Sequence, residues 1–257
     1  MEHLEAVIRE QIEFCSGRIS CLVEIGDWTY EHNANRIYSS ASLIKIPILI
    51  DVFRQYERGV FDLAATISFK KDMIVGGSGV LQALDHSTWT IKDLVTLMII
   101  VSDNTATNHL IDLLGKDSIK NCIESLQLIN TNFQRKMMDL NALERGRDNT
   151  TSASDIVRCL KWIDGNGFLS QESCQTAKSI LQQQQFKGKI PALMDAEKIY
   201  VGSKTGELPG VEHDCAIVSC NEKTAYIAIL IDQIPKGKNC SQMMQEIGKA
   251  LYEEMIR

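Results

Sequence analysis

The chain has 257 residues, 44% of them hydrophobic and 23% charged, and its formal net charge is -6, a composition typical of a soluble globular protein. The acidic balance argues against a nucleic-acid-binding surface, which needs clustered lysine and arginine, and the longest apolar run, residues 94–101, is far shorter than the roughly 20 residues of a membrane helix. We therefore expect a single domain over residues 1–257, with neither a nucleic-acid partner nor a membrane segment.

The first 60 residues predict a helix, a hairpin and a buried helix. Apolar residues recur at helical spacing over residues 3–15. Residues 19–25 and 28–30 flank a turn at 26–27, which is typical of a β-hairpin, and residues 37–38 favour a further short strand. Residues 42–56 are apolar on one face and predict a buried helix. The N-terminus is acidic, unlike a signal peptide, so the protein either stays in the cytosol or has lost a leader, and the compartment is left open.

The middle of the chain predicts mostly helices. Thr90 and Asp93 form a plausible capping pair at the start of a helix over 90–100. A second helix over 104–114 is closed by Gly115. Two more helices are expected over 152–162 and 173–185, the latter ending in a glutamine run.

After residue 190 the pattern changes to strands. Apolar, β-branched runs over 198–203, 214–220 and 224–232 predict three antiparallel strands, and residues 243–255 return to helical spacing. We expect an α/β protein of the α+β type, with an antiparallel sheet of about five strands covered by the N- and C-terminal helices. This sheet lobe would hold residues 1–60 and 191–257, an all-helical lobe residues 61–190, and the ligand site the cleft between them.

Neither cysteines nor histidines indicate a cofactor. The eight cysteines show no C-x-x-C pair and are expected to be buried reduced thiols rather than disulfides or catalytic thiols. The five histidines do not pair at metal-binding spacing, so we expect no metal and no other cofactor. Gly76-Gly77-Ser78-Gly79 lacks the ending of a phosphate loop and favours a flexible cleft wall instead.

Three short segments carry candidate chemistry. Ser42 opens an apolar helix, with Lys45 one turn later on the same face. Residues 102–104 read Ser-Asp-Asn at a junction of predicted helices, and residues 204–206 read Lys-Thr-Gly at the end of a predicted strand. Each alone is an ordinary cap or turn; Ser68 and Lys71 repeat the first spacing in a polar stretch. Together and in this order the three are specific.

This set resembles the S-x-x-K, S-D-N and K-T-G signature of class A β-lactamases and penicillin-binding proteins. The resemblance covers nearly the whole chain, and residues 148–152 resemble the family segment that follows the Ω-loop. It implies that Ser42 is acylated by a β-lactam or an acyl-D-alanine peptide, with its own N–H and that of Glu207 forming the oxyanion hole. Ser102 would relay a proton to the departing nitrogen, and Lys45 would act as base, its pKa lowered by Lys204.

The resemblance also implies a substrate-binding set. Asn104 would hold the side-chain amide of the substrate, and Lys204 and Thr205 its carboxylate. Gly206, Glu207 and Asn141 complete the set of expected substrate-binding residues. The expected partner is a small molecule, and we expect a monomer.

Two positions depart from the family pattern. Hydrolytic class A enzymes carry a glutamate on the Ω-loop in an E-x-x-L-N pattern, and here Met137 stands in its place. A thioether cannot take a proton from water, so deacylation is expected to be weak. One of the nearby carboxylates would substitute if the loop folds differently: Asp139, Glu144 or Asp148. Glu207 also places a carboxylate where an anionic substrate is expected, unless Lys204 or a substrate amine offsets it.

Several functions therefore stay open. The leading one is a β-lactamase-like serine hydrolase. The alternatives are a D,D-peptidase or esterase on the same scaffold, a β-lactam-sensing domain that stays acylated, and a silent structural relative, which the three intact motifs disfavour.

Overall fold

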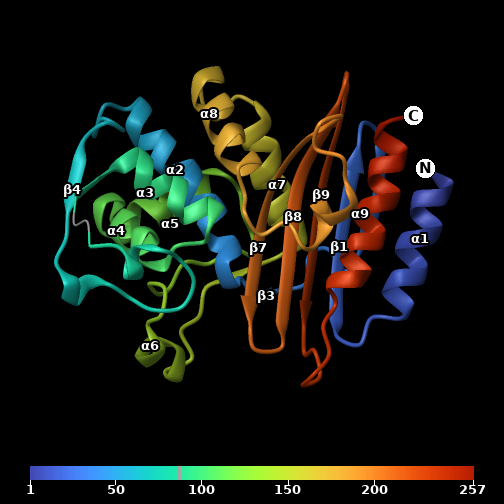
Figure 1. Ribbon diagram of the computed structural model, residues 1–257, viewed down its shortest axis with the longest axis horizontal. Helices are drawn as coiled ribbons and strands as arrows, with labels where there is room; N and C mark the ends of the chain where they lie inside the picture. The colour runs from blue at the N-terminus through green and yellow to red at the C-terminus, as the bar shows by residue number, and fades with distance from the viewer. Residues whose placement is uncertain (86–87) are drawn as a thin grey trace.

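The computed structural model describes residues 1–85 and 88–257, so His86 lies outside the described residues. Its centre is a five-stranded antiparallel sheet in the order β2-β1-β9-β8-β7 (Figure 1). The strands span β1 Arg18–Ile25, β2 Trp28–His32, β7 Tyr200–Leu208, β8 Val211–Cys220 and β9 Lys223–Asp232. Because β1 pairs with β9 from Arg18↔Asp232 to Ile25↔Ala225, the two ends of the chain complete one sheet. The predicted fold class is confirmed.

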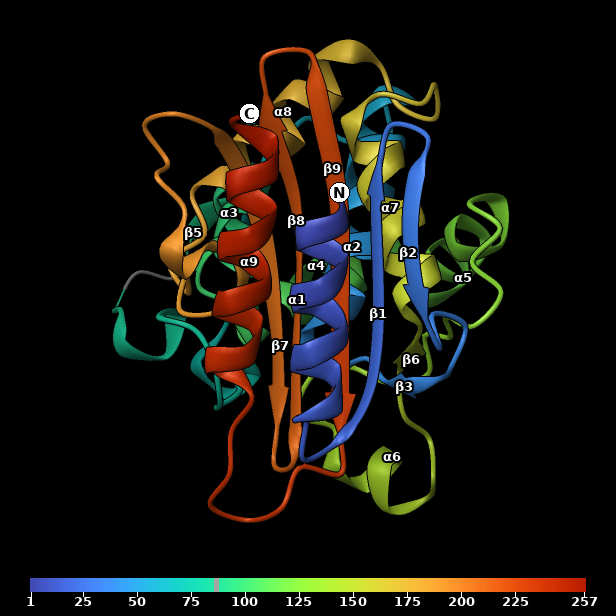
Figure 2. The ribbon, with the colours of Figure 1, turned by 90° about the vertical axis from the view of Figure 1, so that its right-hand side faces the viewer.

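The terminal helices cover one face of this sheet. α1 (Glu2–Glu13) and α9 (Ser241–Met255) lie side by side there (Figure 2). The two-residue period of a strand explains the layers. Along β1, Cys21 and Val23 pack into the apolar cluster shared with Leu4 and Leu251, whereas Leu22 packs into the cluster on the opposite face.

On the opposite face five helices pack around the buried α2 (Lys45–Glu57): α3 Ile91–Ile100, α4 Asn104–Leu114, α5 Lys116–Ser125, α7 Ala153–Asp164 and α8 Gln171–Gln182. α7 and α8 contact strands β9 and β7, and α3, α4 and α5 pack farther out. The short helix α6 (Leu140–Glu144) lies apart from them (Figure 1). The predicted capping pair is present: Thr90 Oγ1 accepts from Asp93 N, and the Asp93 carboxylate accepts from Thr90 N.

Several predicted bounds differ from the structure. The segment predicted to be helical also holds short strands, β4 Thr66–Ser68, β5 Thr88–Thr90 and β6 Thr150–Thr151, the last paired with β3 Tyr38–Ser39. Ser42 does not open an α-helix: it lies in the 3-10 helix η1 (Ala41–Ile44), and α2 begins at Lys45. β7 runs to Leu208 rather than ending at 203, so the Lys-Thr-Gly segment lies inside the strand, because pairing with β8 continues to Val211. None of the helices within residues 1–85 and 88–257 combines the length and hydropathy of a membrane-spanning segment.

Candidate active site

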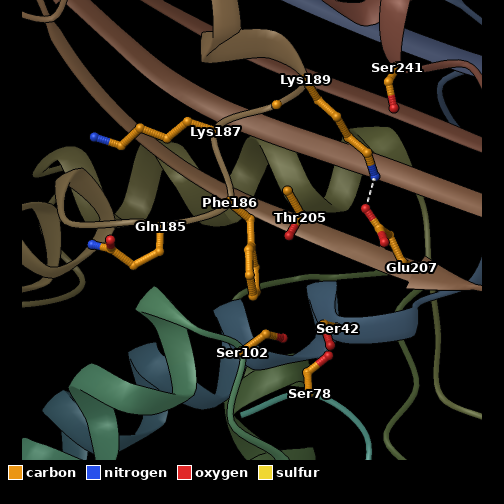
Figure 3. A pocket seen from close by; sticks show the side chains of 11 residues that line it. Ser42, Ser78, Ser102, Gln185, Phe186, Lys187, Lys189, Thr205, Glu207 and Ser241 are labelled. Atoms are coloured by element: carbon orange, nitrogen blue, oxygen red, sulfur yellow. Dashed lines mark ion pairs between the residues drawn. The ribbon is translucent and has the colours of Figure 1, made fainter. Parts of the chain in front are cut away.

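A cavity of about 400 Å³ lies where η1, the start of α4 and strand β7 meet (Figure 3). Ser42 lines it from η1 and is partly exposed. Ser102 lines it from the turn before α4, and Thr205 from β7. All three sequence motifs therefore contribute a side chain to one cavity. Gly206 shows how close β7 comes to η1, because a Cβ there would lie 3.3 Å from both Ala41 Cβ and Leu43 Cγ.

Lys45 is fully buried at the start of α2 and is directed at Ser102 and Asn104. Its Nζ donates to Ser102 O over 2.6 Å, to Ser102 Oγ over 3.0 Å and to Asn104 Oδ1 over 2.9 Å. These bonds use all three donors that an ammonium has. Among the described residues no hydrogen bond joins Lys45 Nζ to Ser42 Oγ, so the buried lysine is anchored on the Ser-Asp-Asn segment.

Ser102 Oγ also accepts a hydrogen bond from a second lysine. Lys204, fully buried in β7, donates from Nζ to Ser102 Oγ over 3.1 Å and to Thr205 O over 2.8 Å. Ser102 has φ +54, in the left-handed region that non-glycine residues rarely adopt. Asp103 holds the turn, since its carboxylate accepts from the backbone N–H groups of Val80, Leu81 and Ala106. These bonds fix the turn at Ser102 both to the start of α4 and to the cavity wall around Ser78.

Both buried lysines have a lowered pKa. Burial lowers the pKa of Lys45 well below its usual 10.5, and the nearby Lys204 ammonium lowers this pKa further, while Asp103 opposes the shift. The sequence pointed to Lys204 as the cause; the larger cause is the loss of water around a side chain closed in by α2 and α4. Burial also lowers the pKa of Lys204 to about 8. Both shifts favour the neutral amine more than for a lysine in water.

Residues 3–255 match the model of the β-lactamase enzyme family. The chain belongs to this family. A β-lactamase from Sphaerobacter thermophilus DSM 20745 is 32% identical, with a TM-score of 0.90 over 99% of this chain and 97% of that chain. No curated protein matches the chain. The resemblance predicted from the three motifs is confirmed.

Two further solved structures are similar in fold. PBP-A is 22% identical, with a TM-score of 0.87 over 99% of this chain and 96% of that chain. A class A β-lactamase from Mycobacterium abscessus is 18% identical, with a TM-score of 0.87 over 99% of this chain and 100% of that chain. At these identities the likeness shows the shared fold of β-lactamases and penicillin-binding proteins.

The loop between α5 and α6 places Met137 inside the protein. The Met137 side chain is buried among the apolar residues around α2 and α4, and Asn108 holds its backbone through bonds to both N and O, of 2.8 and 3.0 Å. Asp139 is occupied as the N-cap of α6, accepting from Ala142 N. Asp148 forms an ion pair with Arg135 over 2.8 Å.

Two residues predicted to bind substrate lie in other surroundings. Asn141 is exposed on α6 and does not line the cavity. Asn104 has both polar atoms engaged, because Oδ1 accepts from Lys45 and Nδ2 donates to Gly76 O over 3.1 Å. A substrate amide would have to share or replace one of these bonds.

The sequence did not point to one wall of the cavity, the segment between α8 and η4 (Ile190–Leu193). Gln184 is fully buried there; its Nε2 donates to Ile99 O over 2.9 Å and its Oε1 accepts from Phe186 N over 3.0 Å. The segment and the start of α9 add these lining residues: Gln185, Phe186, Lys187, Gly188, Lys189 and Ser241. The glutamine run was visible in the sequence, but nothing local indicated that its third member is buried.

Proposed function

We propose that this protein is a class A β-lactamase-like serine hydrolase in which Ser42 is acylated by a β-lactam or by an acyl-D-alanine peptide. One observation carries the proposal: two buried lysines from distant segments, Lys45 and Lys204, meet at Ser102 Oγ beside the cavity that Ser42 lines. This geometry supports a serine nucleophile with amines of lowered pKa close by.

In the proposed first step Ser42 Oγ attacks the lactam carbonyl carbon, and the Oγ proton passes to Lys45. As a neutral amine Lys45 keeps at most two of its three hydrogen bonds, so its lone pair can take this proton. Ser42 Oγ has no hydrogen bond among the described residues, so rotation of its side chain toward Lys45 breaks none. The carbonyl oxygen takes up negative charge, for which the N–H groups of Ser42 and Glu207 are the proposed donors. Each donor of this kind contributes about 10²–10³ in rate.

In the second step the lactam C–N bond breaks, and the nitrogen takes a proton from Ser102 Oγ. Ser102 regains a proton from Lys45, which received one in the first step, so the enzyme gains and loses no net proton. The existing bond from Lys45 Nζ to Ser102 Oγ over 3.0 Å is a ready path for this transfer. Thr205 and Lys204 are the proposed partners of the substrate carboxylate, with Asn104 on its amide.

The acyl-enzyme is proposed to be long-lived. Its hydrolysis needs a base for water, worth about 10²–10⁴ in rate, and Met137 offers none. Among the described residues Glu207 is the one carboxylate that lines the cavity, and it is held in an ion pair. This observation favours a second candidate function, a β-lactam-sensing acyl trap.

Intact-mass measurement after mixing with benzylpenicillin tests the proposal. We expect an adduct of one penicillin on the native protein and none on Ser42→Ala, while Ser78→Ala, which removes another cavity hydroxyl, keeps the adduct. A persistent adduct supports the trap, and a transient one with accumulating product supports hydrolysis. Full labelling of Ser42→Ala would remove Ser42 from the mechanism.

The D,D-peptidase or esterase alternative makes a different prediction. It requires turnover of an acyl-D-alanyl-D-alanine peptide or an ester at a rate above that of the lactam. We further propose that the protein acts as a monomer, which sedimentation velocity tests.

A further inference from the structure

The cavity wall contains an ion pair that the three motifs do not explain. Lys189 Nζ lies 2.7 Å from Glu207 Oε1, and Figure 3 shows this pair on the wall across from Ser42 and Ser102. Both partners line the cavity. Thr205 and Glu207 are two residues apart in β7, so their side chains share one face of the strand. The pair therefore lies next to the proposed site of the substrate carboxylate.

The two partners differ in how firmly they are held. The Lys189 side chain is 5% exposed and that of Glu207 is 66% exposed. Lys189 Nζ also donates to His213 O over 3.5 Å, whereas Glu207 has no second partner among the described residues. Moving Glu207 into water therefore costs little, while a buried ammonium that loses its carboxylate needs a replacement.

The other charged groups near Lys189 do not supply that replacement. Asp214 is fully buried, and its carboxylate already accepts from Ile190 N and Cys215 N, over 2.9 and 3.0 Å. Lys204 lies nearby as a second cation, since Lys189 lowers its pKa and Glu207 raises it. An external carboxylate in the cavity is thus the natural competitor of Glu207 for Lys189.

Resting on the proposed function, we infer that Glu207 sets the charge preference of the site. Its carboxylate pairs with the Lys189 ammonium, which a substrate carboxylate would otherwise bind. Acyl donors that carry a free carboxylate at this wall therefore bind more weakly than neutral ones. Such donors must displace Glu207 and then bind beside it. The substrate class preferred by the native chain is therefore neutral, or zwitterionic with an ammonium group facing Glu207.

Equilibrium binding in a Ser42→Ala background tests this inference without requiring acylation. The probes are benzylpenicillin, which carries a free carboxylate, and its methyl ester, which does not, measured by titration calorimetry or ligand-observed NMR. We expect Glu207→Gln to tighten benzylpenicillin binding about three- to tenfold and the ester less than twofold, as for loss of one partly exposed ion pair. Glu197→Gln, an exposed glutamate outside the cavity, removes the same charge and should change neither.

Each outcome decides the question. Equal changes for acid and ester, or a gain with Glu197→Gln as large as with Glu207→Gln, overturn the inference, as does the absence of any binding. If Lys189→Met is added to Glu207→Gln, the gain for benzylpenicillin should disappear, because no ammonium is left to be released. Selective tightening together with no labelling of the native serine would keep the charge preference and overturn the proposed acylation.

Discussion

Lys45 and Lys204 donate hydrogen bonds to the same oxygen, Ser102 Oγ, over 3.0 and 3.1 Å. Both side chains are fully buried, and neither lysine forms an ion pair with a carboxylate among the described residues. When both amines are protonated, two ammonium groups this close in a buried site repel each other. This repulsion lowers the free energy of unfolding, while the same closeness suits the proton transfers proposed for this site.

Lys204→Met is expected to stabilise the protein at neutral pH. The folded-state pKa of Lys204 is about 8, against 10.5 without burial. Below pH 8 Lys204 is protonated in both the folded and the unfolded protein, so folding bears the full cost of burying its charge. Between pH 8 and 10.5 only the unfolded protein holds this proton, so the cost falls as pH rises. After allowing for two lost hydrogen bonds, we expect a gain of about 2 kcal/mol in the free energy of unfolding at pH 7.

Urea unfolding of native and variant protein at pH 7 and pH 9.5 measures this gain. The difference between the two proteins should shrink at the higher pH, and Lys187→Met, at an exposed lysine, should show no gain at either. A variant less stable than the native protein by the same amount at both pH values would contradict the prediction.

Met137→Glu is expected to shorten the lifetime of the acyl-enzyme at least tenfold, because a carboxylate at this place in the Ω-loop could activate water. The change also places a polar group at a buried side chain, so Tm should fall. The lifetime is read from the decay of the penicillin adduct by intact mass. Met138→Glu is the matched control, since Met138 is 43% exposed; an unchanged lifetime in both variants would show that the loop is aligned wrongly here.

Asp103→Ala is expected to cost about 3 kcal/mol of stability. The change removes the N-cap of α4 and leaves the buried N–H of Leu81 and the N–H of Val80 without their acceptor. Acylation should also slow, because the turn at Ser102 loses its tie. Asp139→Ala, which removes the cap of the short α6, should cost about 1 kcal/mol. Chemical denaturation compares the two, and equal losses would refute the special role of Asp103.

Gly206→Ala is expected to slow acylation at least tenfold with a small loss of stability. The added Cβ would lie 3.3 Å from Ala41 Cβ and Leu43 Cγ, so β7 and the 3-10 helix that carries Ser42 must separate by a few tenths of an ångström. A displacement of this kind would misplace the substrate carbonyl relative to Ser42 Oγ, the proposed nucleophile. Gly188→Ala, whose Cβ would meet nothing within 4 Å, is the control for a methyl group near the cavity, and stopped-flow labelling rates for the two variants should differ.

The sequence by itself determined the local elements, the family and the candidate residues of the site. Helical spacing, the Thr90–Asp93 cap and the β-branched runs depend on neighbours within a few residues, so they could be predicted. The three motifs were recognisable because their order and residue types are rare in combination. Even so, the strand carrying Lys204 was predicted to be too short, since its last residues are held by pairing with β8 rather than by their own apolar character.

Only the tertiary structure decided how these pieces act together. Lys45 and Ser102 are 57 residues apart and Ser102 and Lys204 are 102 apart, so no local pattern could show that two amines share one oxygen. The same holds for the pairing of Lys189 with Glu207 and for the burial of Met137 under Asn108. Burial and charge contact arise from packing between segments that are distant in the chain, and these two quantities set the protonation of the lysines, the accessibility of Ser42 and the charge of the cavity.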